Sequence, residues 1–437
     1  VDPIAALYRE LDPLRPLADD DALYVDWQQK LDPGGANVRS RFVRSFVRDA
    51  SPERPVVRLL TGHRGSGKTT ELNRVESALS GGTSGKKIFV STLHAQQWLD
   101  IQDVEPEDVV LQIVRQLAAD LTKAGMSLGE QRLHGFFRLL WERARGSQLE
   151  SVEVGADPLK FSFALNDFPT ARQEFRDLLR GQLPSAYDLV NGELLPKARQ
   201  HLRQRGFEDI LLVIDDLDKI PQKMLTGQGL TNHEHLFLNH SATLRAIKCS
   251  LLMTVPIELA YSPAKVRLGD AYGRAIGTIP LITVRDREGV PVAAGEQALI
   301  EVIGKRAKVA FAEPATDAAT AAQQIFASEA DLTRAVRLSG GHLRSLLVML
   351  TELLDRVDEL PIPHATLERY ISRAARDMAR GLLPEDKEIL RVVQHTKEAC
   401  GNPRFFSLLR NHYVFAYEYS DKGDWYDVNP LLGEITL

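Results

Sequence analysis

Four short apolar runs of the chain have the length and composition of strands buried inside a sheet. They cover residues 56–60, 87–93, 210–214 and 248–259. Between the second and third runs, residues 108–123 place valine, isoleucine and leucine at the three- and four-residue spacing of a helix with one buried face. Runs that are apolar throughout are typical of a parallel sheet covered by helices on both faces. The pattern therefore predicts an α/β fold with a doubly wound parallel sheet.

After residue 295 the strand-like runs stop and helical spacing dominates. Helices are expected over residues 298–311, 317–326, 330–338 and 364–380, and from residue 342 onward. Two further helices are expected over 385–394 and 402–412, before aromatic and polar residues alternate over 413–432 around an Asp-Lys-Gly-Asp turn. The changes in pattern predict an N-terminal segment (1–50), a core (51–290), a helical lid (291–380) and a small winged-helix-like domain (381–437).

Residues 125–205 are expected to form an insertion, because a doubly wound core needs fewer residues between its strands. Within it, residues 151–163 have the alternation and central turn of a hairpin, and helices are expected over 170–179 and 185–203. The insertion is either a surface for a partner or a packing element of the core.

Length and composition set outer limits on the class of protein. A chain of 437 residues with 44% hydrophobic and 26% charged residues predicts a globular protein of several domains. The net charge of −5 argues against a surface built to coat nucleic acid, and no apolar run reaches the roughly 20 residues of a membrane span. Two cysteines, Cys249 and Cys400, make no disulfide framework. The first residues do not resemble a secretory signal and do not begin with Met, so we expect a cytoplasmic protein with sequence upstream of Val1.

The strongest motif lies directly after the first apolar run, where residues 58–72 read RLLTGHRGSGKTTEL. A strand, a glycine loop ending in Lys-Thr, and a helix form the context of a P-loop. The glycines let main-chain N–H groups point at phosphates, Lys68 is expected to reach the β- and γ-phosphates, and Thr69 to bind Mg²⁺. The motif predicts an ATP/ADP and Mg²⁺ site built from Gly62, His63, Arg64, Gly65, Ser66, Gly67, Lys68, Thr69 and Thr70.

A second motif, made of carboxylates, follows the third apolar run. Asp215 ends that run, at the edge where ligands of parallel sheets bind, and is expected to hold Mg²⁺ together with Thr69. Asp216 and Asp218 are both candidates for orienting the water that attacks the γ-phosphate, and the sequence does not choose between them.

Residues 338–347, LSGGHLRSLL, resemble the signature of ABC-type ATPases, but chain order excludes that class. In ABC proteins the signature precedes the Walker B strand, which ends in the carboxylate that binds Mg²⁺. Asp215 is the corresponding carboxylate here, and the stretch follows it by about 120 residues. The stretch resembles instead the sensor 2 element of AAA+ and related STAND ATPases. The resemblance implies that Gly340 and Gly341 make a turn and that Arg344, in the first turn of the next helix, contacts the γ-phosphate.

The resemblance extends to other positions. Thr254, at the end of the fourth apolar run, matches the sensor 1 residue. Arg274 is the preferred arginine finger that completes the site of a neighbouring subunit, with Arg267 and Arg306 as other candidates. Residues 22–26 in such a protein either contact the adenine or form a docking strand.

The AAA+/STAND resemblance implies an ATP-hydrolysing molecular switch that assembles into a homo-oligomer. The pairing of GHRGSGKTTEL with DDLDK is similar to bacterial defence ATPases, which implies an effector protein as partner. An origin-recognition or transposition-like DNA-remodelling ATPase is the alternative, and a nucleotide-trapping scaffold a third. Arg404, Arg410 and His412 could contact DNA phosphates, although Glu418, Asp421, Asp424 and Asp427 oppose this.

Overall fold

The computed structural model describes residues 2–32, 37–126, 135–136, 169–227, 229–419 and 423–435. The expected hairpin at 151–163 and Asp421 lie outside these residues. The chain forms two compact units that interleave along the sequence: one contains residues 1–40, 62–74 and 278–437, and the other contains 41–61 and 75–277. We call them the lid unit and the sheet unit.

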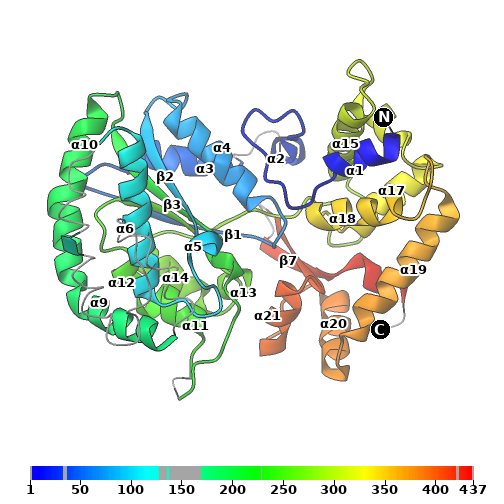
Figure 1. Ribbon diagram of the computed structural model, residues 1–437. Coiled ribbons are helices and arrows are strands. Elements are labelled where there is room, and N and C mark those ends of the chain that lie inside the picture. The colour runs from blue at the N-terminus through cyan, green and yellow to red at the C-terminus, as the bar shows by residue number, and fades with distance from the viewer. Residues whose placement is uncertain are drawn as a thin grey trace. The chain divides into compact units, whose positions relative to one another are not determined.

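A five-stranded sheet runs through the sheet unit in the order β2-β3-β4-β1-β5 (Figure 1). The strands are β1 (Val57–Thr61), β2 (Ile88–His94), β3 (Asp209–Asp215), β4 (Ser250–Thr254) and β5 (Gly277–Thr278), where the chain passes between the units. β1 pairs with β4, β4 with β3, and β3 with β2, always in parallel. All seven residues of β3 and all five of β4 are buried, which explains their continuous apolar runs. With a glycine loop after β1, this is the α/β core of a P-loop NTPase, and the predicted fold class is confirmed.

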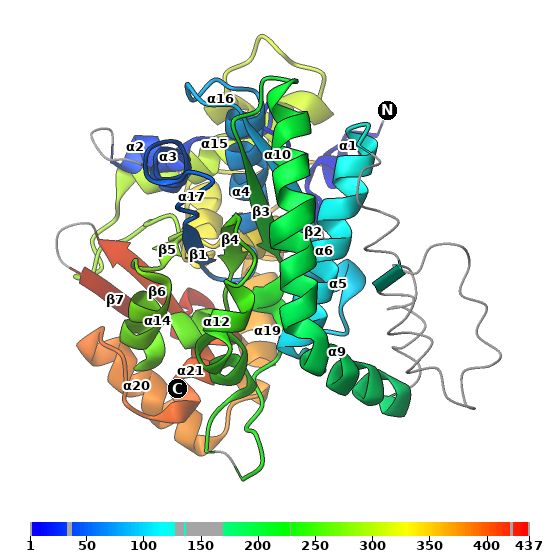
Figure 2. The ribbon, with the colours of Figure 1, turned by 90° about the vertical axis from the view of Figure 1, so that its left-hand side faces the viewer.

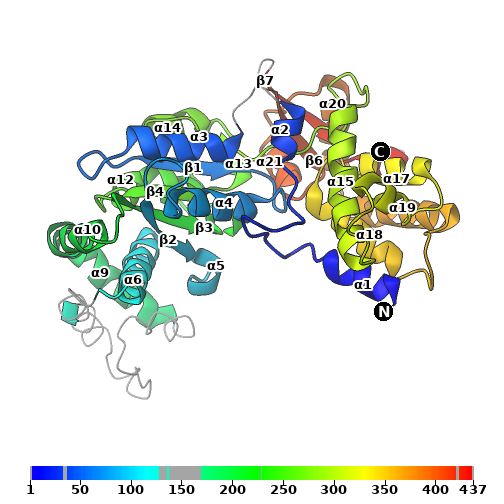
Figure 3. The same cartoon turned by 90° about the horizontal axis from the view of Figure 1, so that it is seen from above.

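Four helices of the sheet unit pack in one core with the buried strands. They are α6 (Pro106–Lys123), α10 (Leu195–Arg203), α12 (Ser241–Leu244) and α14 (Ala264–Tyr272), and Figures 2 and 3 show α6 and α10 side by side. The buried side of α6 carries the valines, isoleucine and leucines of the predicted helix. The unit also contains α5 (Ala95–Trp98), α11 (Asn232–Glu234), the π-helical segments η1 (Ser45–Asp49) and η4 (His235–Asn239), and the 3-10 turn η3 (Leu217–Lys219).

Two predicted boundaries in the sheet unit are wrong. The fourth strand does not reach residue 259, because Pro256 precedes a short helix, α13 (Ile257–Ala260). The two helices expected over 170–179 and 185–203 are instead one long helix, α9 (Pro169–Leu189), a π-helical segment η2 (Val190–Leu194) and α10. Pro184 lies inside α9 without ending it, so helix packing outweighs the local cost of proline.

The lid unit is mostly helical. Its helices are α1 (Pro3–Glu10), α2 (Trp27–Leu31), α15 (Ala293–Ala310), α16 (Ala318–Gln323), α17 (Glu329–Leu338), α18 (Leu343–Leu354) and α19 (His364–Arg380), while α3 (Val38–Arg44) and α4 (Lys68–Ser80) run from this unit into the other. The helices expected after residue 295 are all present, with ends shifted by a few residues. The N-terminal helix α1 packs on α15 and α18 (Figure 1). Residues 22–26 are not a strand, so the docking-strand expectation is wrong.

The C-terminal part of the lid unit has the predicted order of helix, helix and hairpin. It consists of α20 (Pro384–Thr396), α21 (Pro403–Arg410), the antiparallel pair β6 (Val414–Tyr419) and β7 (Gly423–Val428), and the 3-10 turn η5 (Pro430–Glu434). Aromatic rings fill the hairpin's buried face, where Tyr417 stacks on Trp425 with centroids 4.4 Å apart. Among the described helices, none is both long enough and apolar enough for a membrane span.

Candidate phosphate-binding site

The glycine loop, residues 62–67, has the backbone that a phosphate-binding loop requires. Gly62, Gly65 and Gly67 have φ angles of 151°, 92° and 97°, a range that side chains disfavour. The loop leads into α4, whose first residue is Lys68, so a helix N-terminus adds positive potential beside it. The backbone at these three positions therefore favours glycine.

Lys68 and Ser66 show how the loop fits an anion. Nζ of Lys68 donates hydrogen bonds to the main-chain oxygens of Gly62 and His63, at 2.8 and 2.9 Å, which fixes the ammonium group over the loop. Oγ of Ser66 is buried and has no hydrogen-bond partner among the described residues. Since buried polar atoms are almost always paired, this hydroxyl fits a loop whose partner is a phosphate oxygen.

Arg344 lies against the loop, as the sensor 2 resemblance implies. A Cβ atom added to Gly65 would lie 2.5 Å from Cβ and 3.1 Å from Nε of Arg344. Nε also donates to the main-chain oxygen of Pro13, at 3.2 Å. The turn before α18 is made by Gly340 and Gly341, where an added Cβ on Gly341 would lie 1.7 Å from the oxygen of Ile282. The structure thus brings together the two motifs, residues 62–67 and Arg344.

Histidines join the loop to its neighbours in the lid unit. Nε2 of His342, the N-cap of α18, lies 2.7 Å from the main-chain oxygen of Arg64, and Nδ1 accepts from the N–H of Ser345 at 3.2 Å. His63 is turned away from the loop, and its Nε2 accepts the N–H of Ala416 at 2.9 Å. His342 is therefore the tautomer protonated on Nε2, and His63 the one protonated on Nδ1.

His412 completes this group, with its ring centroid 4.5 Å from that of His342. Burial, and then the neighbouring histidines and Lys68, hold the pKa values of His63 and His342 well below the usual value. Burial, and then Lys68, Arg344 and Arg64, lower the pKa of His412 to about 4. All three rings are neutral at pH 7. Within the described residues, no group of three or more His, Cys, Asp or Glu side chains is arranged to hold a metal ion.

The N-terminal segment lies along the first turns of α4. The N–H of Leu17 donates to Oγ1 of Thr70 at 3.1 Å, and the hydroxyl of Tyr24 donates to Glu71 at 2.9 Å. The guanidinium of Arg74 covers the Tyr24 ring at 3.6 Å. Burial raises the pKa of Glu71. The hydroxyl of Thr70, which the sequence assigned to the cofactor, is thus used in docking this segment.

The sheet unit contains the second half of the predicted site. Asp215 ends β3 and is 2% exposed, and its Oδ1 accepts the N–H of Asp216 at 2.8 Å. Oγ1 of Thr254, at the end of β4, accepts the N–H of Leu217 at 3.1 Å. The carboxyl ends of β3 and β4 therefore bring Asp215, Asp216 and Thr254 together, as parallel pairing requires.

Asp216 has a strained backbone. Its φ of 72° and ψ of 0° lie in the left-handed region, which costs a residue with a side chain about 1–2 kcal/mol. The hydrogen bonds on either side of it, together with an ion pair of 2.6 Å from Lys219 to its Oδ1, hold this conformation. Asp218 lies on η3 and is also buried, at 8% exposed. Strain that the surroundings maintain is a common property of functional positions, and here it distinguishes Asp216.

The three candidate arginine fingers differ in exposure. The side chains of Arg267 and Arg274 are 62% and 61% exposed, and each makes an ion pair, with Glu234 at 3.7 Å and with Asp49 at 3.0 Å. Arg306 is 6% exposed, and its Nη1 donates to the main-chain oxygen of Val302. A buried guanidinium bound to its own helix is not available to another chain, which removes Arg306 from the candidates.

The residues proposed for DNA contact are mostly engaged inside the C-terminal part. Arg404 makes two hydrogen bonds to Asp386, of 2.8 and 3.0 Å, and the His412 ring packs in the histidine cluster. Asp427, counted as an acid opposing DNA, is 3% exposed and pairs with Lys397 at 2.6 Å and Arg285 at 2.9 Å. The expectation for Asp427 as a surface acid is wrong, because its side chain is buried. His412 is partly exposed, and its contact with phosphates stays a prediction.

Sequence reasoning missed the lid-unit contacts of the loop. His63 and Arg64 occupy variable positions of the motif, and nothing in the sequence links His63 to Ala416 or Arg64 to His342, which lie 353 and 278 residues further along the chain. Tyr24, Glu71 and Arg74 were missed for the same reason. One signal was available: His342 lies directly before a helical run, where a side chain can cap the helix N-terminus.

No family model matches the chain, and no curated protein matches its sequence. Similar solved structures include a Walker-type ATPase of Pyrococcus abyssi, 14% identical with a TM-score of 0.43, covering 97% of this chain and 99% of that one. The ORC2 protein of Aeropyrum pernix is 11% identical with a TM-score of 0.41, covering 97% and 93%. The ORC1 protein of Aeropyrum pernix, solved in complex with DNA, is 13% identical with a TM-score of 0.36, covering 97% and 93%. Likeness at these TM-scores does not define a function for this chain. The function is therefore argued from the chain's own residues.

Proposed function

We propose that the chain is an ATP-binding and ATP-hydrolysing switch of the AAA+ type. The observation that carries the proposal is the packing of Arg344 against Gly65 in the glycine loop. A guanidinium at that place can form charge-assisted hydrogen bonds with a γ-phosphate, an acceptor that ADP does not offer. Binding of ATP and of ADP would then favour different positions of α18, which is the requirement for a nucleotide switch.

The other candidates have roles that their chemistry supports. The loop N–H groups and Lys68 bind the phosphates, Thr69 and Asp215 hold Mg²⁺, and Thr254 positions the turn that follows Asp215. When bound, Mg²⁺ supplies positive charge that offsets the charge of the phosphate oxygens. We assign the orientation of the attacking water to Asp216, on the strength of its strained and supported backbone, with Asp218 as the alternative.

The finer parts of the function rest on resemblance. The AAA+/STAND pattern favours a homo-oligomer in which Arg274 reaches the nucleotide of another copy, and an effector protein whose activity the switch controls in a bacterial defence system. A DNA-remodelling ATPase is the second candidate, favoured by the helix, helix and hairpin order of residues 384–428. The internal ion pairs of Arg404 weigh against direct phosphate contact by that residue.

Light scattering with ADP and with a slowly hydrolysed ATP analogue tests the proposal. We expect the analogue, and not ADP, to drive the chain into a defined oligomer. The Arg344→Ala variant should not form this oligomer with either nucleotide. Arg373→Ala, an exposed arginine of α19, is the matched control and should assemble as the parent chain does. Assembly that requires duplex DNA would favour the remodelling ATPase, and nucleotide binding unaffected by Lys68→Ala would refute both candidates.

A further inference from the structure

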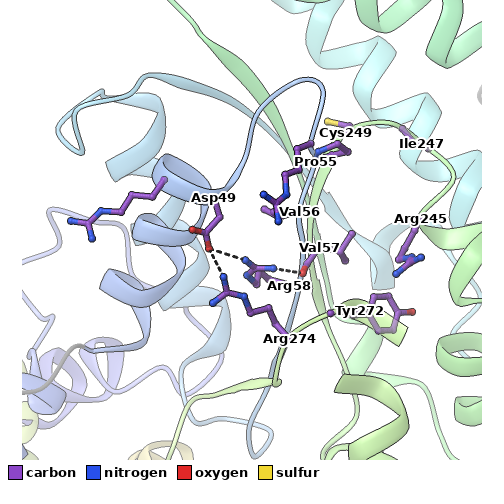
Figure 4. Close-up of a pocket in the computed structure, with 13 residues that line it drawn as sticks. Asp49, Pro55, Val56, Val57, Arg58, Arg245, Ile247, Cys249, Tyr272 and Arg274 are labelled. Carbon is purple, nitrogen blue, oxygen red and sulfur yellow. Dashed lines mark hydrogen bonds and ion pairs between the residues drawn. The ribbon is translucent and has the colours of Figure 1, made fainter. Parts of the chain in front are cut away.

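A cavity of about 680 Å³ in the sheet unit is lined mainly by arginines (Figure 4). It lies at the beginning of β1, whereas the glycine loop follows the end of that strand. In the part of the chain that the structure describes, its charged lining consists of five arginines and one acid: Arg48, Arg54, Arg58, Arg245, Arg274 and Asp49. Five positive charges around one carboxylate make this cavity attractive to anions.

Asp49 is shared between two of the arginines. Its Oδ2 accepts from Nη2 of Arg58 at 3.2 Å and from Nη2 of Arg274 at 3.0 Å, as the dashed lines in Figure 4 show. Arg58 is 8% exposed, and burial, followed by the charge of Arg274, lowers the pKa of its guanidinium. One carboxylate therefore serves two guanidinium groups, while Nε and Nη1 of Arg58 donate to Oγ of Ser45 and to the main-chain oxygen of Val57.

The remaining arginines have little to compensate them. Arg48 and Arg54 are exposed and make no side-chain ion pair within the described residues, and Arg245 donates to the main-chain oxygen of Ala271. The lining also includes the buried residues Ile247, Cys249 and Tyr272 and the partly buried Val57. Cationic groups around these side chains, in a volume typical of small-ligand pockets, indicate a compact anion and not an extended one.

We propose that this cavity binds a compact polyphosphate anion, which replaces Asp49 as the acceptor for Arg58 and Arg274. Several phosphates can accept bidentate hydrogen bonds from several guanidinium groups at once, which a single carboxylate cannot do. The inference is independent of ATP hydrolysis at the glycine loop. It places Arg274 among the arginines that line the cavity, whereas the sequence analysis treated it as a single arginine finger.

Calorimetric titration with sodium tripolyphosphate tests the proposal, using Lys68→Ala to weaken binding at the glycine loop. We expect binding of one tripolyphosphate per chain, with an affinity that falls as salt is added. In the same background, Arg54→Ala with Arg245→Ala should weaken binding at least tenfold. Arg373→Ala with Arg380→Ala, whose side chains are 68% and 80% exposed on α19, should leave it unchanged.

Asp49→Asn should change the affinity for tripolyphosphate in the opposite direction. It removes the competing negative charge while keeping a similar shape, so tripolyphosphate should bind several times more tightly. Absence of tripolyphosphate binding to Lys68→Ala, or equal affinity in the Arg54→Ala and Arg245→Ala variant, would overturn the proposal. Binding of duplex DNA in place of tripolyphosphate would overturn it as well.

The polyphosphate could come from solution or from the nucleotide of a second copy. Titration at a concentration where light scattering gives a monomer separates these sources. Saturable binding by the monomer assigns the cavity to a free polyphosphate. Binding of ATP at the cavity that appears only with assembly, and that Arg245→Ala removes, assigns it to a triphosphate carried by another copy.

Discussion

The main-chain N–H of Ala416, in the C-terminal hairpin, donates a hydrogen bond of 2.9 Å to Nε2 of His63, the second residue of the glycine loop. His342 makes the corresponding contact from α18, to the main-chain oxygen of Arg64 at 2.7 Å. The loop that is proposed to bind phosphate is therefore bonded directly to the proposed sensor helix and to the C-terminal hairpin of the same unit. A change in loop conformation must break or carry along both contacts.

His63→Ala should loosen the hairpin. The N–H of Ala416 is buried, and loss of its acceptor leaves it unpaired at a cost of about 1–3 kcal/mol. Hydrogen exchange followed by mass spectrometry should show faster exchange over residues 414–419. His395→Ala, an exposed histidine of α20, should leave exchange in this strand unchanged. Equal protection in His63→Ala would mean that the hydrogen bond does not hold the hairpin.

Stability should fall as the pH is lowered from about 6.5 toward 4, because the histidine cluster is held neutral with pKa values below the usual 6.5. Over that range the unfolded chain binds protons that the folded chain does not, so the loss is up to about 1.4 kcal/mol per pH unit for each histidine. Denaturant unfolding at several pH values measures it.

His412→Asn tests this assignment. Asparagine tolerates the φ of 63° found at His412 and does not titrate, so the pH dependence should become shallower. His364 is the control in which the pH dependence has the opposite sign, because the hydrogen bond that it donates to Asp331 raises its pKa. The stability that this pair contributes is present at low pH and is lost as pH rises, and His364→Asn should remove it. An unchanged slope in His412→Asn would contradict the prediction.

Gly65→Ala should abolish nucleotide binding, since its Cβ would meet Arg344 at 2.5 Å. Gly85→Ala is the matched control. Gly85 has a φ of 87°, close to the 92° of Gly65, and an added Cβ there has nothing within 4 Å. Both variants place alanine at a similar φ, so a loss of affinity for a fluorescent ATP analogue in Gly65→Ala alone assigns the effect to the loop and its contact with Arg344. Similar affinities would show that this contact is unimportant.

Asp216→Asn should lower the ATPase kcat at least a hundredfold while leaving nucleotide affinity nearly unchanged. The change keeps the size of the side chain and the left-handed backbone but removes the charge that orients water. Asp218→Asn should have a much smaller effect. Steady-state ATPase assays and nucleotide titration of both variants measure this, and the reverse order of effects would assign the water to Asp218.

Cys249 should be inert to thiol reagents in the folded chain. It is 2% exposed, and burial raises the pKa of its thiol far above the usual value. Cys400 is partly exposed. Titration with a chromogenic disulfide should therefore modify one thiol per chain quickly, and the second only after denaturant is added. Fast modification of both would show that the wall of the arginine-lined cavity opens in solution.

The sequence by itself determined the core strands, most helices, the glycine loop and the place of Asp215. These features depend on local patterns: apolar runs for buried strands, three- and four-residue spacing for helices, and glycine where φ is positive. The expected helix at 364–380 has the bounds of α19, His364–Arg380. The pattern was less reliable at the ends of strands and at Pro184, where packing against neighbours decides.

Only the tertiary structure decided which distant side chains meet. Residues 62–64 make hydrogen bonds to residues 342 and 416, and Asp49 bonds to Arg274, 225 residues further along the chain. No local pattern encodes such pairs, because they depend on how whole elements pack. Burial was undecided for the same reason: Arg306 and Asp427 are charged in the sequence but only 6% and 3% exposed in the fold.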